Sequence, residues 1–561
     1  MKSSLSLFSL TALLVLQFTG GAKANPTGGH VSSPVVQISN GTVHGKYLRG
    51  WNQDAFLKIP YAQPPVGDLR FRPPQYINRN LGAIQATNYG PHCVGYGPDQ
   101  VGFDTSEDCL TINVVRPAGI RPGEKLPVAV WIHGGGFFMG GAASPRYNLT
   151  WMVDQSVKLN KRIIGVSMNY RLAGWGFLAS REVAGSLNLN NGLKDQRLAL
   201  HWIQENIAKF GGDPRKVTIF GESAGGASVG FQHIAFNGRD DKLFRGAIMQ
   251  SGGSVQYQSS QFPTDKAVQD NYNRVVAAAD TLQCLRGADR AVLDAVFPTA
   301  QFGVVIDGSF VPGFGSEAIK RGRYVRVPTI IGCTSDEGAS FGQIGANNAQ
   351  DIANFLGAIS TLTPPSIQRI LELYPESASI PPAENFTGQD DGTAQNGLQY
   401  HRAAAIIGDW FFIANQRLVA QELARQGVPV WSYRFRTRTN GAPVWRRAGH
   451  FQEVAFVFNN VNGEGYDGVF DDGNPMGGPH AADYKKLADF MSRNWVGFVH
   501  GLDPRVGAKN REVRWLSYAE GNGKSQIVFD IDVDGPTYME TDNYRQEGIA
   551  FMNERVLEGS R

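Results

Sequence analysis

Ser223 is the residue best placed to do covalent chemistry. It stands at the centre of Gly221-Glu222-Ser223-Ala224-Gly225, which follows an apolar, β-rich run and precedes a plausible helix. A strand–turn–helix of this kind is so tight that the residues two before and two after the serine must be small, and both are glycine. A serine raised on such a turn can attack a carbonyl carbon. The alternative is a structural serine in a glycine-rich turn, which the motif alone does not exclude.

A second glycine-rich segment, His133-Gly134-Gly135-Gly136-Phe137, lies upstream at the end of another strand-like run. Glycines there let backbone N–H groups approach a substrate, and such groups stabilise the negative oxygen that develops during acyl transfer. We predict that the N–H groups of Gly135, Gly136 and Ala224 form this oxyanion hole. A merely flexible loop is the alternative, and the position ahead of the serine turn disfavours it.

A serine hydroxyl is a weak nucleophile unless a base takes its proton, so a histidine and an orienting carboxylate are needed. In folds with this serine turn the chain order is serine, acid, histidine. His450 is the best candidate base because it lies in a loop just after an apolar run at 430–435. His401 and His500, at the ends of predicted helices, fit the role less well.

The acid is less clear from the residues themselves. Asp336 and Glu337 both follow the apolar run at 329–331 directly. Either carboxylate would reach the same edge of a sheet, so the choice between them stays open at this point.

These side chains require a scaffold that brings distant segments together. Short apolar runs predict strands, with helical patterns between them, and one such helix spans 193–210 before Gly211 and a turn at Asp213-Pro214. Strands that alternate with helices indicate a mostly parallel sheet covered on both faces. We see no repeat and no linker that would separate domains. The predicted strands are 128–132, 163–168, 217–220, 247–249, 329–331, 430–435 and 527–529.

The composition is that of an ordinary globular chain. Of the 561 residues, 42% are hydrophobic and 18% are charged, which excludes disordered, collagen-like and coiled-coil chains. With 53 basic and 50 acidic side chains the formal charge is +3. A balance so near zero argues against a nucleic-acid partner, which would require a basic face.

Residues 1–24 predict a secretory signal peptide. Lys2 precedes an apolar stretch at 5–18, and Ala22-Lys23-Ala24 supplies a small-x-small cleavage pattern. The stretch is shorter than the roughly 20 residues of a membrane span. We therefore expect a secreted, extracellular chain with no membrane span, in which residues 25–561 form a single domain. Three glycosylation sequons fit this route, at Asn40, Asn148 and Asn385.

Four cysteines are too few for a disulfide scaffold in a chain of this size. Cys93 and Cys109 are 16 residues apart and flank a stretch rich in Gly, Pro and Asp. A bond between them would form a surface clip worth about 3 kcal/mol in the chain-entropy model. Cys284 and Cys333 could pair or remain free.

Further sequence blocks accompany the serine turn and the glycine loop. In chain order the blocks are IPYAQPPVGDLRF at 59–71, SEDCL at 106–110, HGGGF at 133–137, NYRL at 169–172, FGESAGG at 220–226, QSG at 250–252, DEG at 336–338 and GHFQE at 449–453. With these blocks in this order, the chain resembles the type-B carboxylesterase/lipase family, which includes cholinesterases and fungal lipases. The resemblance runs from about residue 41 to near the C-terminus.

The resemblance implies an α/β-hydrolase fold, with a large, mostly parallel central sheet flanked by helices and carrying long insertions. It implies a carboxylic-ester hydrolase that needs no cofactor and no metal. The implied roles are nucleophile for Ser223, acid for Glu337, base for His450 and oxyanion hole for Gly135, Gly136 and Ala224. The implied structural pairs are the Cys93–Cys109 disulfide and the ion pairs Arg70 with Glu107 and Arg171 with Asp195.

Two departures from the family pattern bear on function. The usual partner of Cys284 is absent from residues 272–282, so we expect Cys284 to be unpaired. The loop at 94–108 is short and holds no Trp, whereas family lipases carry a long apolar lid there and cholinesterases a Trp that faces a quaternary ammonium group. We therefore expect neither a true interfacial lipase nor a cholinesterase.

The segment Asp530-Ile531-Asp532-Val533-Asp534-Gly535 matches the first half of a calcium-binding loop. Position 12 is Thr541, where a bidentate Glu is required. The alternation from Ile527 to Val533 followed by Asp-Gly favours a strand and a turn instead.

We therefore predict a serine esterase that acts on a small-molecule ester, either soluble or moderately bulky. One alternative is a lipase for longer-chain acylglycerols, and another is a non-catalytic adhesion module, as in relatives that have lost the nucleophile. Acyl transfer to an acceptor other than water would use the same residues. The oligomeric state is left open.

Overall fold

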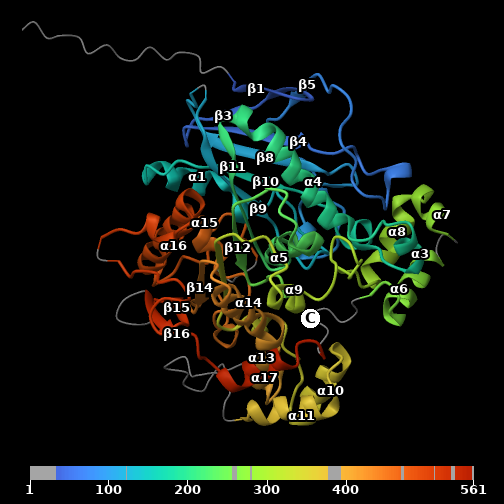
Figure 1. The fold of residues 1–561 in the computed structure, drawn as a ribbon, viewed down its shortest axis with the longest axis vertical. Helices are drawn as coiled ribbons and strands as arrows, with labels where there is room; N and C mark the ends of the chain where they lie inside the picture. Colours follow the sequence, from blue (N-terminus) through green and yellow to red (C-terminus); the bar gives the residue numbers. More distant parts are fainter. Residues whose placement is uncertain are drawn as a thin grey trace, which may run out of the picture.

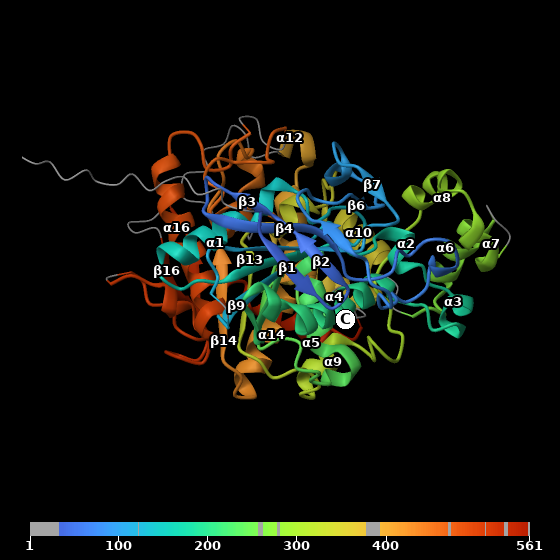
Figure 2. The same cartoon turned by 90° about the horizontal axis from the view of Figure 1, so that it is seen from above.

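The computed structural model describes residues 33–121, 123–255, 262–277, 281–376, 393–468, 473–510, 512–531 and 537–558. A large twisted sheet runs through the middle of the molecule, with helices on both sides (Figures 1 and 2). Two small sheets lie outside it, one formed by β1, β2 and β5 and one by β6 and β7. The predicted signal peptide, Asn385 and most of the calcium-like segment lie outside the described residues.

The central sheet has eleven strands in the order β16-β15-β14-β13-β12-β11-β9-β10-β8-β4-β3. The strands from β10 to β15 pair in parallel, and β8, β4, β3 and β16 add antiparallel pairs at the two sides. The strands of this sheet are β3 (Lys46–Leu48), β4 (Gln53–Pro60), β8 (Thr111–Pro117), β9 (Leu126–Ile132), β10 (Ile164–Met168), β11 (Gly212–Glu222), β12 (Gly246–Gln250), β13 (Thr329–Thr334), β14 (Val430–Phe435), β15 (Ser525–Phe529) and β16 (Thr537–Thr541).

The smaller strands are β1 (Val35–Ile38), β2 (Gly41–His44), β5 (Ala83–Gln85), β6 (His92–Cys93) and β7 (Thr105–Ser106). The helices are α1 (Leu149–Lys158), α2 (Ala173–Phe177), α3 (Arg181–Gly185), α4 (Asn191–Asn206), α5 (Ala224–Gly238), α6 (Lys266–Val276), α7 (Leu282–Gly287), α8 (Arg290–Val296), α9 (Gly315–Lys320), α10 (Ala349–Ile359), α11 (Pro364–Leu373), α12 (Thr393–Asn396), α13 (Tyr400–Gly408), α14 (Ala414–Arg425), α15 (Val454–Phe458), α16 (Ala481–Gly501) and α17 (Gln546–Glu554).

All seven predicted strands are present, and the mostly parallel sheet is confirmed. The sequence argument missed β4 and β8, which pair antiparallel with each other and carry a register shift between Phe56 and Ile59. The predicted turn at Asp213-Pro214 is wrong, because both residues belong to β11. A register shift between Gly212 and Val217 interrupts the pairing there, so the proline, which has no N–H, is tolerated inside the strand.

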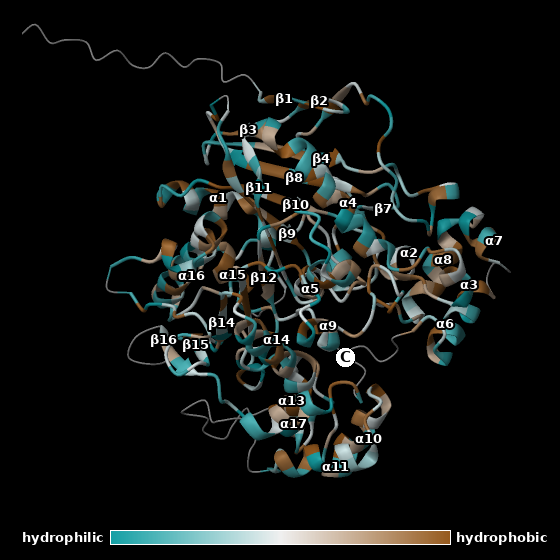
Figure 3. Cartoon of the chain, viewed as in Figure 1, coloured by the Kyte–Doolittle hydropathy of each residue, from teal (hydrophilic) through white to brown (hydrophobic). Residues whose placement is uncertain are grey.

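Side chains alternate between two cores along each buried strand. On β9, Val128 and Val130 pack in a cluster with α4 and α5, whereas Trp131 packs in a second cluster with α1, α15 and α16. Figure 3 shows the hydrophobic residues along the inner strands and more hydrophilic residues on the outer elements. Burial on both faces explains why these strands are nearly continuous apolar runs.

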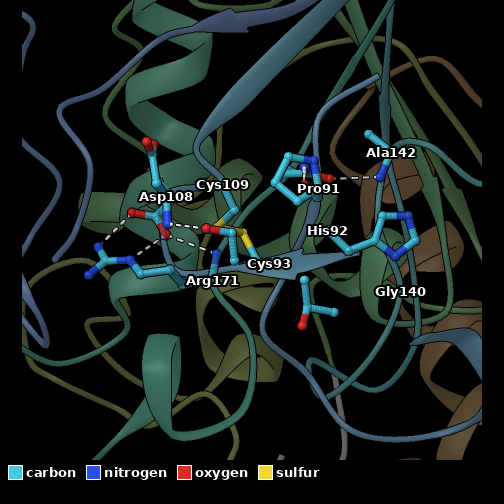
Figure 4. The surroundings of a disulfide bond; sticks show 12 residues. Pro91, His92, Cys93, Asp108, Cys109, Gly140, Ala142 and Arg171 are labelled. Atoms are coloured by element: carbon cyan, nitrogen blue, oxygen red, sulfur yellow. Dashed lines mark hydrogen bonds and ion pairs between the residues drawn. A yellow bond between two sulfur atoms is a disulfide. The ribbon is translucent and has the colours of Figure 1, made fainter. Parts of the chain in front are cut away.

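The Cys93–Cys109 disulfide is present, with Cα atoms 5.0 Å apart. Both cysteines are buried, so the expectation of a surface clip is wrong for the sulfur atoms, although Val101 in the enclosed loop is exposed. Figure 4 shows the bond between Arg171 on one side and His92 on the other. Cys284 and Cys333 are free, the first exposed and the second buried.

Both implied ion pairs form. Arg70 contacts Glu107 through two hydrogen bonds of 2.7 Å. Arg171 contacts Asp195 at 2.6 and 2.8 Å, and the Asp195 side chain is fully buried. Arg171 also donates to the carbonyl of Arg72, so one guanidinium fastens three distant segments.

The structure also shows the surroundings of the calcium-like segment and of two of the glycosylation sequons. Asp530 is buried and pairs with Arg436 at 2.9 Å, and β15 and β16 form an antiparallel pair on either side of the calcium-like segment. The Asn40 side-chain nitrogen donates to the carbonyl of Ile77 at 3.0 Å, and Asn148 caps α1. Among the described residues, no helix is both long and apolar enough to cross a membrane.

Replacing Arg171 tests the buried pair. Arg171→Gln leaves the Asp195 carboxylate buried without its cation, and we expect the free energy of unfolding to fall by about 3–5 kcal/mol. The matched control is Arg369→Gln, because the side chains of Arg369 and its partner Glu372 are 52% and 50% exposed, and loss of this pair should cost less than about 1 kcal/mol. Denaturant unfolding measures both, and equal costs would contradict this view of the pair.

Candidate active site

The residues singled out from the sequence gather where five adjacent strands end. The strand registers align Ile132 with Gly221, Glu222 with Gln250 and Gln250 with Gly332. Thr334 on β13 in turn lies opposite Phe435 on β14. The segments that follow these strands therefore meet at one edge of the sheet, where parallel α/β folds usually bind ligands.

The turn around Ser223 has the predicted tight geometry. Ser223 has φ 56° and ψ −123°, a strained conformation for a residue with a side chain. A Cβ atom on Gly221 would lie 2.5 Å from the Ile132 carbonyl oxygen, and one on Gly225 would lie 2.1 Å from it. The two glycines thus permit the close approach of β9 that the serine turn requires.

The glycine loop after β9 adopts backbone angles suited to glycine. Gly135 and Gly136 have φ values of 98° and 64°, and a Cβ atom on Gly135 would lie 2.3 Å from the Met139 carbonyl oxygen. His133 steadies this loop, since its Nδ1 lies 2.9 Å from the Gly134 carbonyl and its ring stacks on Tyr170. Burial lowers the pKa of His133 to about 3, so this imidazole is neutral and structural.

The two candidate acids, Asp336 and Glu337, have different partners. The Oε2 atom of Glu337 lies 2.5 Å from Nδ1 of His450, whereas Asp336 is buried on another side and faces Arg447 at 4.0 Å. The other Glu337 oxygen accepts hydrogen bonds from the Ser251 hydroxyl at 2.5 Å and the Thr334 N–H at 2.8 Å. Three donors therefore fix this carboxylate.

Aromatic rings hold the imidazole of His450. Phe341 and Phe412 each have ring centroids 4.9 Å from it. Phe412 belongs to a π-helical turn, Asp409–Ile413, between α13 and α14. Asp409 is fully buried in that turn and pairs with Arg545 at 2.6 Å, so a packed ion pair supports the ring that contacts His450.

The second ring nitrogen of His450 faces an unexpected partner. Its Nε2 lies 3.2 Å from Oε1 of Glu222, the residue before Ser223. Within the described part of the chain, the Ser223 hydroxyl makes no hydrogen bond to His450. A hydrogen bond between the imidazole and the Ser223 hydroxyl requires a rotation of the ring or of the serine side chain. Catalytic hydrogen bonds are often absent or long in structures without a substrate.

Charges around His450 shift the protonation of the cluster. Burial opposes charge on His450, but the carboxylates of Glu222 and Glu337, with Glu453 beyond them, outweigh it and raise its pKa to about 9. Burial also raises the pKa of Glu222 well above its usual value, and burial together with the charge of Glu337 raises the pKa of Glu453 to about 7. The shifted pKa values of His450, Glu222 and Glu453 therefore belong to one interacting buried group.

A cavity of about 950 Å³ opens over Ser223 and Ala224. Its volume is near the upper end of the range for small-molecule sites, about 300–1,000 Å³. Much of its wall is aromatic, and Gly136 lines it as well. The phenylalanines that line it are Phe137, Phe138, Phe177, Phe302, Phe341, Phe411 and Phe412.

Sequence reasoning missed some members of this site. Glu222 was visible as the variable residue inside the serine motif, and Ser251 follows β12 in the QSG block, but neither position carries a chemical signal by itself. Glu453 was noted only as part of a motif. Each of these side chains belongs to the site because it is buried near His450 or Glu337. No local sequence pattern predicts that position. Within the described residues, no group of three His, Cys, Asp or Glu side chains could hold a metal.

The sheet order, the strained serine turn and the loops at the carboxyl edge define an α/β-hydrolase. The chain belongs to the carboxylesterase family, whose model matches residues 32–551, and it is a carboxylic ester hydrolase. It is 37% identical to "Lipase 4" of Diutina rugosa, over 92% of this chain and 95% of that one. It is 34% identical to "Secreted triacylglycerol lipase LIP1" of Gibberella zeae, over 92% of this chain and 89% of that one.

A solved structure shows the same architecture. The crystal structure of Aspergillus niger EstA matches with a TM-score of 0.81 and 28% identity, and the match covers 95% of this chain and all of that one. The fold expected from the sequence is therefore confirmed.

Changing Glu222 to Gln tests the charge cluster around His450. A histidine that acts as a base must be neutral. If His450 is that base, its pKa of about 9 predicts an acid limb of the pH profile in which kcat/KM falls as the pH drops below about 9. Glu222→Gln removes one of the carboxylates that favour the protonated ring, and we expect this limb to move to lower pH by about one unit or more. A pH profile of kcat/KM measures the shift.

Asp336→Asn is the control for this experiment. It also removes a buried carboxylate near β13, but one that faces Arg447 instead of His450. Its pH profile should follow that of the unmodified protein. A limb that stays in place in Glu222→Gln would contradict the assigned coupling.

Proposed function

We propose that the chain hydrolyses carboxylic esters through an acyl-enzyme on Ser223. The observation that carries the proposal is the 2.5 Å contact between Glu337 and Nδ1 of His450, at the edge where Ser223 is raised on its turn. In this proposal His450 is the base, Glu337 orients it, and the N–H groups of Gly135, Gly136 and Ala224 form the oxyanion hole.

In the first half of the reaction, Nε2 of His450 leaves Glu222 and takes the proton of the Ser223 hydroxyl. The serine oxygen attacks the ester carbonyl carbon, and the carbonyl oxygen becomes negative between the three N–H groups. Glu337 stabilises the imidazolium and keeps Nδ1 protonated. The imidazolium then gives its proton to the departing alkoxide, so alcohol leaves and the acyl-enzyme remains.

In the second half, a water molecule enters beside His450, which takes a proton from it as the water oxygen attacks the acyl carbon. The same oxyanion hole stabilises the second tetrahedral intermediate. Collapse returns the proton to Ser223 and releases the acid. No step in this sequence requires a metal or an organic cofactor.

We also propose that the substrates are soluble or moderately bulky esters. The loop closed by the disulfide is short, and none of its described residues lines the cavity. Its Tyr96 donates a 2.7 Å hydrogen bond to Asp294 and is not among the residues that line the cavity. A lipase for longer-chain acylglycerols is the second candidate, because the relatives named above are lipases and the cavity is large and aromatic.

The proposal includes export as a single domain. Residues 1–24 have the pattern of a signal peptide, the disulfide suits an oxidising compartment, and one relative is named as secreted. The sequons at Asn40, Asn148 and Asn385 remain candidate glycan sites. The adhesion alternative would require loss of the nucleophile, whereas Ser223 is in place.

Ser223→Ala tests the nucleophile. The variant should lose at least about 10³-fold in kcat on p-nitrophenyl butyrate, since only the oxyanion hole and binding remain. A fluorophosphonate probe should label the unmodified protein and not the variant. Ser251→Ala serves as the control. It removes a hydroxyl that contacts Glu337 but keeps Ser223, so the probe should still label it. Labelling at another residue would contradict the proposal.

A chain-length series tests the substrate class. On p-nitrophenyl esters from acetate to palmitate, we expect kcat/KM to be greatest for short or medium acyl chains. On long chains, activity should not jump when the substrate passes its micellar limit, because no lid from the disulfide loop covers the cavity. A sharp rise at that limit would favour the lipase candidate.

A further inference from the structure

The lining of the cavity contains both aromatic and polar side chains. Most of the phenylalanines come from other elements, whereas α6 and the segment at 299–303 supply most of the polar side chains, together with Phe302. In Figures 1 and 2 α6 packs with α3, α7 and α8 in a lobe at one side of the molecule. A substrate that fills the cavity therefore contacts both aromatic and polar side chains.

Among the described residues that line the cavity, two are charged: Asp270 and Arg274. They lie one helical turn apart on α6. Asp270 already has a cation, because Lys266 lies 2.5 Å from its carboxylate. Arg274 donates one hydrogen bond, of 3.1 Å, to the carbonyl of Thr299. Arg274 is exposed, and no carboxylate of the described residues lies within ion-pair distance of it, so the Thr299 carbonyl is the one described acceptor for its N–H groups.

The polar neighbours of Arg274 are held in place by one another. Asn271 donates to the Gln301 carbonyl at 2.6 Å and accepts from the Gln301 N–H at 3.1 Å. This reciprocal pair fastens α6 to the segment at 299–303. The backbone around Arg274 is thereby fixed, whereas its guanidinium keeps the donors that can bind an oxyanion in a bidentate manner.

We propose that Arg274 binds a carboxylate at the distal end of the ester substrate. The preferred substrates are then esters with an apolar middle, which packs on the phenylalanines, and a carboxylate that reaches α6. This inference rests on the proposed function, since it names the substrate class of the same site. Arg274 acts in binding alone and takes no part in the chemistry at Ser223.

The test compares pairs of methyl esters that differ only in the distal group. One member of each pair ends in a carboxylate and the other in a carboxamide, and the number of methylenes between the ends varies through the series. Methanol release gives kcat/KM for each. At the spacing that reaches Arg274, the carboxylate ester should exceed its carboxamide partner by about two- to fivefold, the range of an exposed ion pair, and the excess should shrink at high salt.

Variants connect this preference to one side chain. Arg274→Gln should remove the preference for the carboxylate, and Arg274→Lys should keep part of it, because a lysine retains the charge without the bidentate fork. The matched control is Arg181→Gln on α3, an exposed arginine that does not line the cavity. Its ratio of carboxylate to carboxamide rates should stay at that of the unmodified protein.

Three results would overturn the inference. The first is a carboxylate ester with no advantage at any spacing, and the second is an advantage that persists in Arg274→Gln. The third is an equal loss of the advantage in Arg181→Gln, which would mean that only the long-range electrostatic field matters. Failure of the proposed function has a different signature, because p-nitrophenyl butyrate would then also remain uncleaved by the unmodified protein.

Discussion

One buried imidazole shared among three carboxylates is the interaction on which the site depends. Glu337 holds one nitrogen of His450 and Glu222 faces the other, while Glu453 adds its charge from the same interior. Burying so much negative charge is costly unless protons or cations compensate for it. The raised pKa values of His450, Glu222 and Glu453 are the form that this compensation takes.

The rest of the fold holds that cluster together. The parallel registers bring five strand ends to one edge, and the π-helical turn, tied down through Asp409 and Arg545, presses Phe412 onto the imidazole. Farther away, the Arg171–Asp195 pair fastens the segments behind the glycine loop. Rigid support of this kind lets a strained Ser223 persist at the turn.

Much of the architecture could be predicted because its signals are local. The apolar runs of β9 to β15 are buried on both faces, so they stand out without any partner. The antiparallel strands β4 and β8 were missed since their pairing, with its register shift, is not visible in either strand. The prediction of a turn at Asp213-Pro214 is wrong because both residues lie in β11, where a register shift lets the strand contain the proline.

The sequence by itself determined the serine turn, the glycine loop and the order of the candidate groups, because glycines at fixed spacing and a short apolar run each report a local backbone geometry. Only the tertiary structure shows that Glu337, and not Asp336, contacts His450, and that Glu222 faces the other ring nitrogen. Those outcomes depend on distances between segments more than a hundred residues apart. Such distances are set by packing and burial, and no stretch of neighbouring residues contains them.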